Sequence, residues 1–237
     1  MGLLHSNPPL VTLIMLAASA VSEGQGGSGL LARVDHLVYA TPDLDRGIKE
    51  IEDLLGVRAM LGGRHPGRGT RNALIALGPS VYLEIIAPDP DQPTPQAPRS
   101  FGLDTLRTSH LVTWAAKSND VDSLRRNAMA NGIALGEVET GQRQRPDGVT
   151  LSWRFTNSTS VVASGIVPFF IDWGASPHPS RSAPQGATLV ALRAEHPDER
   201  RVRRMLDVLG LDLRVSHGAR AALIAVIDGR EGRVELR

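Results

Sequence analysis

Three side chains that could bind a divalent cation stand on short apolar segments of this sequence. His36 opens the segment HLVYA at residues 36–40, His110 opens HLVTWA at residues 110–115, and Glu84 lies within YLEII at residues 82–86. Neutral imidazole and carboxylate groups are usual ligands of divalent metals, and burying a carboxylate without a partner is costly. The sequence therefore predicts a metal site; the alternatives are structural histidines and a Glu84 side chain on a solvated face.

The composition restricts the other kinds of chemistry and the kinds of partner. The 237 residues contain no cysteine, which excludes disulfides, thiolate nucleophiles and thiolate metal ligands. The net charge is +1 and no stripe of basic and aromatic residues appears, so nucleic acid is not the expected partner. We expect a small-molecule partner, bound by an ordinary globular chain with 41% apolar residues.

The first 29 residues are expected to lie outside the fold. Residues 10–20 form an apolar run ending in Ala18-Ser19-Ala20, which is typical of a signal-peptidase site, but no Lys or Arg precedes Arg33. The run is too short to span a membrane, and residues 22–29 have the composition of a flexible linker. We expect residues 1–29 to be a leader or a disordered extension of a cytoplasmic protein; the alternative is export, if residues 1–20 are a signal peptide.

The two histidines belong to a pattern that recurs along the chain: a strand, a helix, then three strands. In the first copy, the strand from His36 leads to a helix with Thr41 at its cap and Pro42 at its first position. Apolar residues at spacings of three and four form one helical face, and Gly56 ends the helix. Three short strands are then predicted at residues 57–61, 72–77 and 81–86.

Two further copies follow with the same order of elements. The second has a strand from His110, a helix capped by Asp120, and strands at residues 134–139, 150–156 and 167–173. The third has a strand from Thr188, a helix from Pro197, and strands at residues 211–216, 221–228 and 233–236. Proline-rich stretches separate the copies. The predicted units are therefore residues 30–98, 99–180 and 181–237.

The third unit is only partial where metal chemistry is concerned. Thr188 stands at the first-strand position and cannot replace histidine as a ligand. Glu235 lies 47 residues after Thr188, close to the 48 residues that separate His36 from Glu84, and is interpreted as a relic of a ligand position. An odd unit also leaves a sheet edge unpaired, which proteins usually cover. One hypothesis for this edge is pairing with a second subunit, which would give a homodimer.

Taken together, these segments resemble the vicinal oxygen chelate superfamily and, within it, the bacterial glyoxalase-like domain family. Besides the repeated unit, the resemblance rests on GGRHPGRGTRNAL at residues 62–74, YLEIIAP at 82–88, RPDG at 145–148 and PFFIDW at 168–173. It implies an α+β fold in which βαβββ units form curled mixed sheets around a cavity, the glyoxalase/bleomycin-resistance/dihydroxybiphenyl-dioxygenase fold.

The resemblance also implies a divalent metal (Fe, Zn, Mn or Ni) held by His36, Glu84 and His110. The fourth ligand position falls near Phe170 or Ile171, where the sequence departs from the glyoxalase pattern, and only Asp172 nearby could bind metal. Four ligands would suit an isomerase or lyase, whereas two histidines and one carboxylate form the ligand set of non-haem iron dioxygenases. Both types of enzyme remain open.

Further residues are expected at the substrate. Glu84 or Asp172 would act as a base, and Arg145, with Arg143 beside it, would bind an anionic group. His65 lies in a predicted glycine-rich loop, where it would hydrogen-bond the substrate or cap a turn.

Trp153 is expected in the cavity wall, where its ring would bound the substrate site. The predicted function is a glyoxalase-like metalloenzyme acting on a small, anionic carbonyl or vicinal-oxygen substrate. The alternative is a non-catalytic module of the same fold that binds or sequesters a small molecule.

Overall fold

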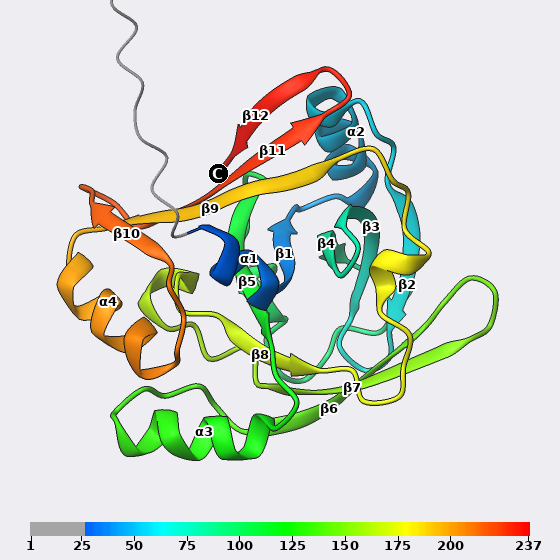
Figure 1. Ribbon diagram of the computed structural model, residues 1–237. Helices are drawn as coiled ribbons and strands as arrows, with labels where there is room; N and C mark the ends of the chain where they lie inside the picture. Colours follow the sequence, from blue (N-terminus) through cyan, green and yellow to red (C-terminus); the bar gives the residue numbers. More distant parts are fainter. Residues whose placement is uncertain (1–26) are drawn as a thin grey trace, which may run out of the picture.

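The computed structural model describes residues 27–237, and its elements follow the order expected from the sequence (Figure 1). Most of the predicted leader, residues 1–26, lies outside the described residues. Its last residues, 27–29, begin helix α1 (Gly27–Arg33) and do not form the expected linker. No helix of the described part is long and apolar enough to cross a membrane.

The first unit contains four strands and one three-turn helix. In chain order the elements are β1 (Val34–Ala40), α2 (Leu44–Leu55), β2 (Met60–His65), β3 (Thr70–Gly78) and β4 (Val81–Pro88). β1 pairs in parallel with β4, and β3 is antiparallel to both β4 and β2. The last strand of the unit therefore lies beside the first, and the sheet order is β1-β4-β3-β2.

The second unit repeats this topology and closes the sheet into a barrel. Its elements are β5 (His110–Lys117), α3 (Val121–Ala130), β6 (Val138–Gln144), β7 (Thr150–Thr156) and β8 (Phe169–Asp172). The barrel order is β1-β4-β3-β2-β6-β7-β8-β5, with β1 antiparallel to β5. Short 3-10 turns lie in the connections: η1 (Ser100–Gly102), η2 (Ala163–Gly165) and η3 (Pro179–Arg181).

The third unit forms a separate sheet that lies against the outside of the barrel (Figure 1). Its elements are β9 (Thr188–His196), α4 (Glu199–Val208), β10 (Arg214–His217), β11 (Ala222–Gly229) and β12 (Gly232–Leu236). The Arg230 N–H donates to the Leu55 carbonyl at 2.8 Å, which ties the β11–β12 turn to the end of α2. Apolar side chains of this unit join those of α2 and of the outer barrel face in one core.

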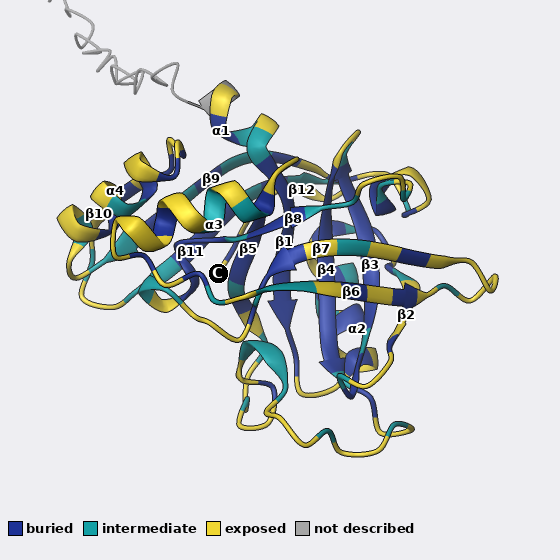
Figure 2. Ribbon diagram, turned by 90° about the horizontal axis from the view of Figure 1, so that it is seen from below, coloured by how far each residue is buried: buried dark blue, intermediate teal, exposed yellow. Residues whose placement is uncertain are grey.

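Strand alternation divides the side chains of the barrel between two environments. On β1, Leu37 and Tyr39 point outward into the main core, whereas His36 and Val38 point inward. On β4, Glu84 also points inward. Because both sides of the sheet are covered here, every residue of β1 is buried (Figure 2). The barrel therefore encloses polar side chains in a buried interior.

The predicted cap of the first helix was wrong by two residues. Asp43 caps α2 and accepts a hydrogen bond from the Arg46 N–H at 2.8 Å, whereas Thr41 and Pro42 precede the helix. The Thr41 hydroxyl is occupied elsewhere, because it donates to the Asp43 carbonyl at 2.8 Å. Gly56 ends the helix as expected, in the left-handed conformation with φ of 65°.

The glycine-rich segment that was expected to be a loop instead includes strand β2. Gly63 has φ of 139°, and a Cβ on it would lie 2.1 Å from the Gln144 carbonyl oxygen. Only glycine therefore lets β2 approach β6 closely enough to close the barrel. As a consequence, His65 stands at the end of a strand, with its side chain inside the barrel.

Candidate functional site

The barrel interior contains a cavity lined by both of the first two units. β7, β8 and the residue that follows β8 contribute mainly aromatic side chains, among them Trp153, Phe155, Phe169 and Trp173. The other strands of the cavity wall, and the β2–β3 turn, contribute polar and charged side chains: His36, His65, Arg68, Asn72, Glu84 and Arg143.

His36 is held in one orientation by the residue before it. Its Nδ1 lies 2.8 Å from Oδ1 of the buried Asp35. Burial alone would raise the pKa of Asp35, but hydrogen bonds from His178 and His36 outweigh it and hold the pKa well below its ordinary value. Trp173 donates a further hydrogen bond at 3.2 Å. The ionised Asp35 carboxylate keeps a proton on Nδ1 of His36, so Nε2 is the atom that faces the cavity.

Glu84 lies at one end of a hydrogen-bonded chain of side chains along the cavity wall. Its Oε1 accepts a hydrogen bond from Asn72 Nδ2 at 2.5 Å, and Asn72 Oδ1 accepts one from Arg143 Nη1 at 3.2 Å. These two contacts determine the orientation of the Asn72 amide. The other oxygen, Oε2, lies 3.8 Å from Nε2 of His36. Glu84 Oε2 and His36 Nε2, which come from the neighbouring strands β4 and β1, therefore lie side by side in the cavity.

His65 is a neutral hydrogen-bonding group beside this chain. Its Nδ1 lies 2.9 Å from Thr70 Oγ1, and its Nε2 lies 3.4 Å from Asn72 Nδ2. Burial lowers the pKa of His65 to about 4, a shift that the charge of Glu84 partly opposes. At neutral pH its Nδ1–H therefore donates to Thr70, while Nε2 accepts from Asn72.

Arg143 is a buried cation that has no carboxylate partner within residues 27–237. It is 3% exposed, and among residues 27–237 its guanidinium has a hydrogen bond to Asn72 and no ion pair. Burial lowers the pKa of Arg143, but arginine remains charged at neutral pH. Burying an unpaired charge is costly, so the remaining N–H groups of Arg143 are well suited to bind an anionic group of a ligand.

The aromatic wall gives the cavity an apolar side. The ring centroids of Trp153 and Trp173 are 5.0 Å apart, and the Phe169 ring meets the His36 imidazole edge-on at 5.5 Å. Arg68 lies over the Phe155 ring at 5.0 Å and is also paired with a glutamate. A ligand in the cavity would therefore contact charged groups on one side and aromatic rings on the other.

His110 does not lie with His36 and Glu84. It is exposed at the start of β5, where its Nδ1 lies 3.0 Å from the Thr108 carbonyl oxygen. The helix caps give the true correspondence between units, because His36 lies seven residues before the cap Asp43 and Thr113 lies seven before the cap Asp120.

The strand register extends this correspondence to Glu84. Val38 pairs with Glu84 in the first unit, and Ala115 pairs with Phe169 in the second. Val38 and Ala115 each lie five residues before their helix cap. Phe169 is therefore the counterpart of Glu84, just as Thr113 is the counterpart of His36. Aligning the two units on their HLV strings therefore paired His36 with His110, which lies three residues before its true counterpart, Thr113.

The residues present do not fit the predicted metal site. Of the three expected ligands, the structure brings together His36 and Glu84 but not His110. The second unit offers a threonine and a phenylalanine at the matching positions, and phenylalanine has no ligand atom. Within residues 27–237, no three His, Asp or Glu side chains converge to hold a metal ion.

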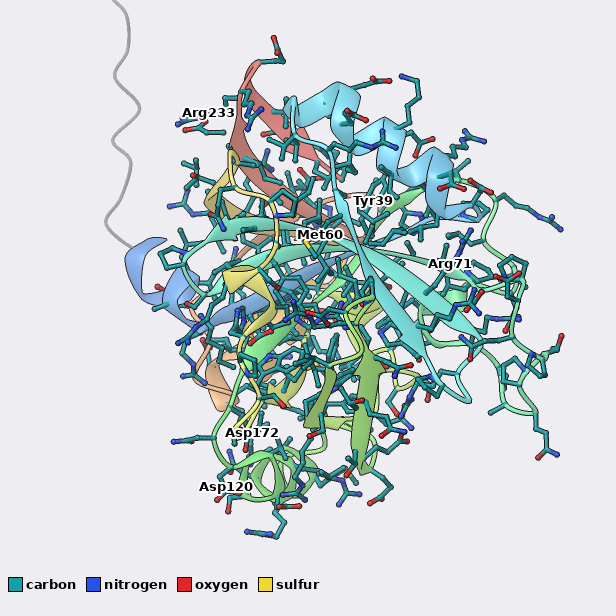
Figure 3. All side chains as sticks on the ribbon, turned by 90° about the vertical axis from the view of Figure 1, so that its right-hand side faces the viewer. Tyr39, Met60, Arg71, Asp120, Asp172 and Arg233 are labelled. Atoms are coloured by element: carbon teal, nitrogen blue, oxygen red, sulfur yellow. The ribbon has the colours of Figure 1, made fainter. Side chains whose placement is uncertain are left out.

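Two further predicted site residues also lie outside the cavity lining. Asp172 is on β8 between inward-facing residues, and its Oδ1 accepts a hydrogen bond from the Gly174 N–H at 2.8 Å. Figure 3 shows it on the side of the molecule where Asp120 caps helix α3. Arg145 forms an ion pair with Asp147 at 2.7 Å in the turn after β6. By contrast, His65 and Trp153 line the cavity.

Asp35 and Asn72 belong to the site but were not among the residues expected from the sequence. Asp35 immediately precedes His36, and an inward histidine beside a carboxylate in an otherwise apolar strand was an available signal. Asn72 directly precedes the apolar run of β3 and carried no such signal, because strand alternation alone does not show which side of β3 faces the cavity.

Comparisons with known proteins agree with this architecture. A family model described as a glyoxalase-like domain matches residues 34–210. Among solved structures, a hypothetical protein from Staphylococcus aureus is 15% identical with a TM-score of 0.56, and the match covers 85% of this chain and 83% of that chain.

A methylmalonyl-CoA epimerase from Mycobacterium tuberculosis is 22% identical with a TM-score of 0.41, and the match covers 68% of this chain and 93% of that chain. No curated protein matches this chain significantly. The family match spans most of the chain, from β1 into the third unit, and the curled mixed sheet has the expected vicinal oxygen chelate architecture. The chain therefore belongs to the glyoxalase-like domain family.

Proposed function

We propose that this chain is an enzyme that moves a proton on a small anionic carbonyl compound bound in the barrel cavity. The observation that carries the proposal is the buried, unpaired Arg143 connected through Asn72 to Glu84, which lies beside His36. Arg143 would bind the anionic group, and the reacting carbon would lie between Glu84 and His36. This assigns an isomerase- or lyase-type reaction to the site.

The chemistry requires a base whose lone pair is available and a second group that can accept a proton nearby. Glu84 Oε2 would remove a proton from the carbon next to the carbonyl, and the C–H electron pair would move to form an enolate on the carbonyl oxygen. His36 Nε2, oriented by Asp35, lies 3.8 Å from Glu84 Oε2. The proton would pass from the Glu84 carboxyl to His36 Nε2 and from there to an adjacent position of the enolate, which returns both side chains to their starting state. His65 is neutral and donates its one N–H to Thr70, so its part is to accept from Asn72 and hold that amide in place rather than to donate to the enolate oxygen.

A metal ion bound by His36 and Glu84 would lack a third His, Asp or Glu ligand within the described residues. The proposal therefore assigns no step to a metal ion, and the Fe, Zn, Mn or Ni named by the resemblance would need a different ligand set. The metal content of the purified wild-type protein and of a His36→Ala variant shows whether a metal ion binds at this site, independently of activity.

A second candidate function is binding without catalysis. It is favoured by the aromatic wall, because four rings from or next to β7 and β8 make up most of the second unit's half of the site, where neither a histidine nor a carboxylate lines the cavity. Such a cavity would suit sequestration of an aromatic or apolar molecule.

Deuterium exchange distinguishes the two candidates without a known substrate. 2-Oxobutanoate has an anionic carboxylate and exchangeable C3 protons, and its deuteration in heavy water is followed by proton NMR. The proposal predicts that the chain accelerates exchange and that Glu84→Gln reduces the acceleration at least about 100-fold, since general-base catalysis contributes roughly 10²–10⁴-fold.

The matched control is Glu52→Gln, a glutamate on the exposed side of α2 that pairs with Arg58. It should leave the exchange rate unchanged. If 2-oxobutanoate binds to the wild-type chain but its exchange is not accelerated, the enzyme proposal fails and the binding module is supported.

A further inference from the structure

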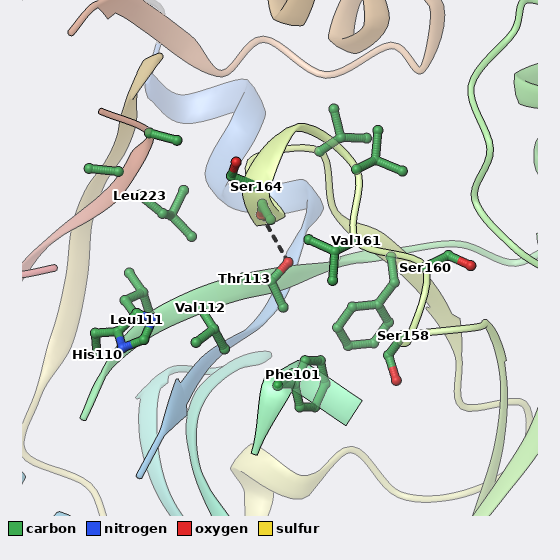
Figure 4. Close-up of a pocket in the computed structure, with 17 residues that line it drawn as sticks. Phe101, His110, Leu111, Val112, Thr113, Ser158, Ser160, Val161, Ser164 and Leu223 are labelled. Atoms are coloured by element: carbon green, nitrogen blue, oxygen red, sulfur yellow. Dashed lines mark hydrogen bonds between the residues drawn. The ribbon is translucent and has the colours of Figure 1, made fainter. Parts of the chain in front are cut away.

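A second cavity lies between the second and third units, outside the barrel (Figure 4). Its volume is about 370 Å³, within the range of small-molecule pockets. Val112 on β5 forms its floor, Val161 lies at its rim, and Ala222 and Leu223 on β11 form the wall from the third unit. None of its lining residues is Asp, Glu, Lys or Arg. We name this cavity the outer groove.

The outer groove adjoins the barrel cavity. Phe101, Ser158 and Phe169 line both. Phe101 has φ of 62°, a left-handed conformation that is unfavourable for a phenylalanine, and its ring centroid lies 6.1 Å from that of Phe169. The fold therefore holds two rings at the border between the barrel cavity, which contains the charged groups, and the outer groove, which is lined by uncharged and mainly apolar residues apart from His110.

The contacts between side chains show the order in which the functional groups lie along the barrel cavity. Arg143 contacts Asn72, Asn72 contacts Glu84, and Glu84 faces His36. The imidazole of His36 meets the ring of Phe169, which borders the outer groove. An anionic group on Arg143 would therefore lie at one end, the reacting carbon in the middle, and the remainder of the molecule at the Phe169 end.

We propose that the outer groove binds the unbranched apolar tail of the ligand whose anionic head lies at Arg143. This inference rests on the proposed function and extends its substrate class from a small compound to an anionic carbonyl compound that carries a medium or long unbranched chain. It also gives the third unit a part in binding, because β11 supplies one wall of the groove. Thr113 and Phe169, which stand in place of ligand residues in the second unit, line the path of the tail.

Calorimetric titration with propanoate, hexanoate and dodecanoate tests the inference on the full chain. For the wild-type protein, affinity should rise at least 10-fold from propanoate to dodecanoate, because each buried methylene adds apolar contact. Val112→Asp places a charge on the groove floor, and Ala222→Trp fills the wall that the third unit supplies. Both should remove the dependence on chain length and leave the affinity for propanoate within about 2-fold.

The matched control is Val208→Asp on α4, an exposed valine outside the groove, which should keep the dependence on chain length. Circular dichroism melting shows that each variant is folded. Wild-type affinity that does not rise with chain length, or that rises equally in Val112→Asp, would overturn the inference. Arg143→Gln separates this failure from that of the proposed function, since it should weaken all three carboxylates by a similar factor.

Discussion

The environment of His65 predicts how stability depends on pH. Its folded-state pKa is lowered to about 4 from 6.5 by burial, so the unfolded chain takes up a proton first as pH falls. The neutral histidine therefore stabilises the fold fully above pH 6.5, and this contribution is lost as pH falls from 6.5 to about 4. The full effect is about 3 kcal/mol.

Replacing His65 by Gln should reduce the loss of unfolding free energy as the pH falls. Urea unfolding at pH 7 and pH 4.5 measures it, with His217→Gln as the control, because His217 is exposed on β10. The assignment would be contradicted if the two variants lost equal amounts of stability between these pH values.

Asp35 predicts a second effect at the scale of one residue. Asp35→Asn removes the charge that keeps the proton on Nδ1 of His36, so the imidazole should shift toward the Nε2–H tautomer. Nitrogen-15 NMR of the His36 ring detects that shift. We expect the exchange activity to fall about 10- to 100-fold, as for other groups that orient a catalytic side chain; an unchanged tautomer would contradict this role.

The sequence could predict only part of the site at the residue scale. The pairing of His36 and Glu84 depends on two adjacent parallel strands and followed from the order of elements. Arg143 and Arg145 differ by two positions and were indistinguishable until the register of β6 placed the first inside the barrel and the second in a turn. Residues two apart share a strand face, so alternation could not separate them, and the end of β6 at Gln144 was not visible in the sequence pattern.

At the element scale, η2 holds the loop against β5. Gly165 has φ of 85°, and a Cβ there would lie 2.0 Å from the Val112 carbonyl oxygen. The Gly165 carbonyl also accepts a hydrogen bond from Thr113 Oγ1 at 2.9 Å (Figure 4). The loop that borders the outer groove can therefore approach β5 only with glycine at this position.

Gly165→Ala should lower the free energy of unfolding by at least about 3 kcal/mol. Gly148→Ala is the matched control, because it has the same φ of 85° but nothing within 4 Å of the added Cβ. It should cost only about 1 to 2 kcal/mol, the penalty of the left-handed conformation. Equal losses in chemical denaturation would show that the close contact with Val112 does not matter.

The order of elements was more predictable than their ends. Helix α2 was expected from its apolar spacing and Gly56, and both are present. Strand β2 was shifted toward the chain's later residues, because Gly62 and Gly63 look like a loop in sequence but permit barrel closure in space. Local composition could not reveal that, since the requirement comes from Gln144, about 80 residues away along the chain.

At the scale of the whole molecule, the third unit completes the core. Leu189, Val202 and Ile227 from this unit belong to the same cluster as Leu44 and Ile51 of α2. Removing it would expose a broad apolar face of the first unit to water.

A chain of residues 27–187 should therefore fail to fold cooperatively, whereas residues 27–237 should fold. Circular dichroism and solubility measure the difference. A shortened chain with an unchanged melting temperature would contradict the single core. The homodimer and the cytoplasmic location remain predictions, and sedimentation of the full chain measures the first.

Anion binding in the barrel cavity depends on Arg143. Calorimetry with 2-oxobutanoate on Arg143→Gln and on Arg154→Gln, an arginine on the exposed side of β7 that pairs with Asp122, tests it most directly. We predict at least a 10-fold loss of affinity in the first variant, about 1.4 kcal/mol, and no change in the second. Equal affinity in both variants would contradict the account.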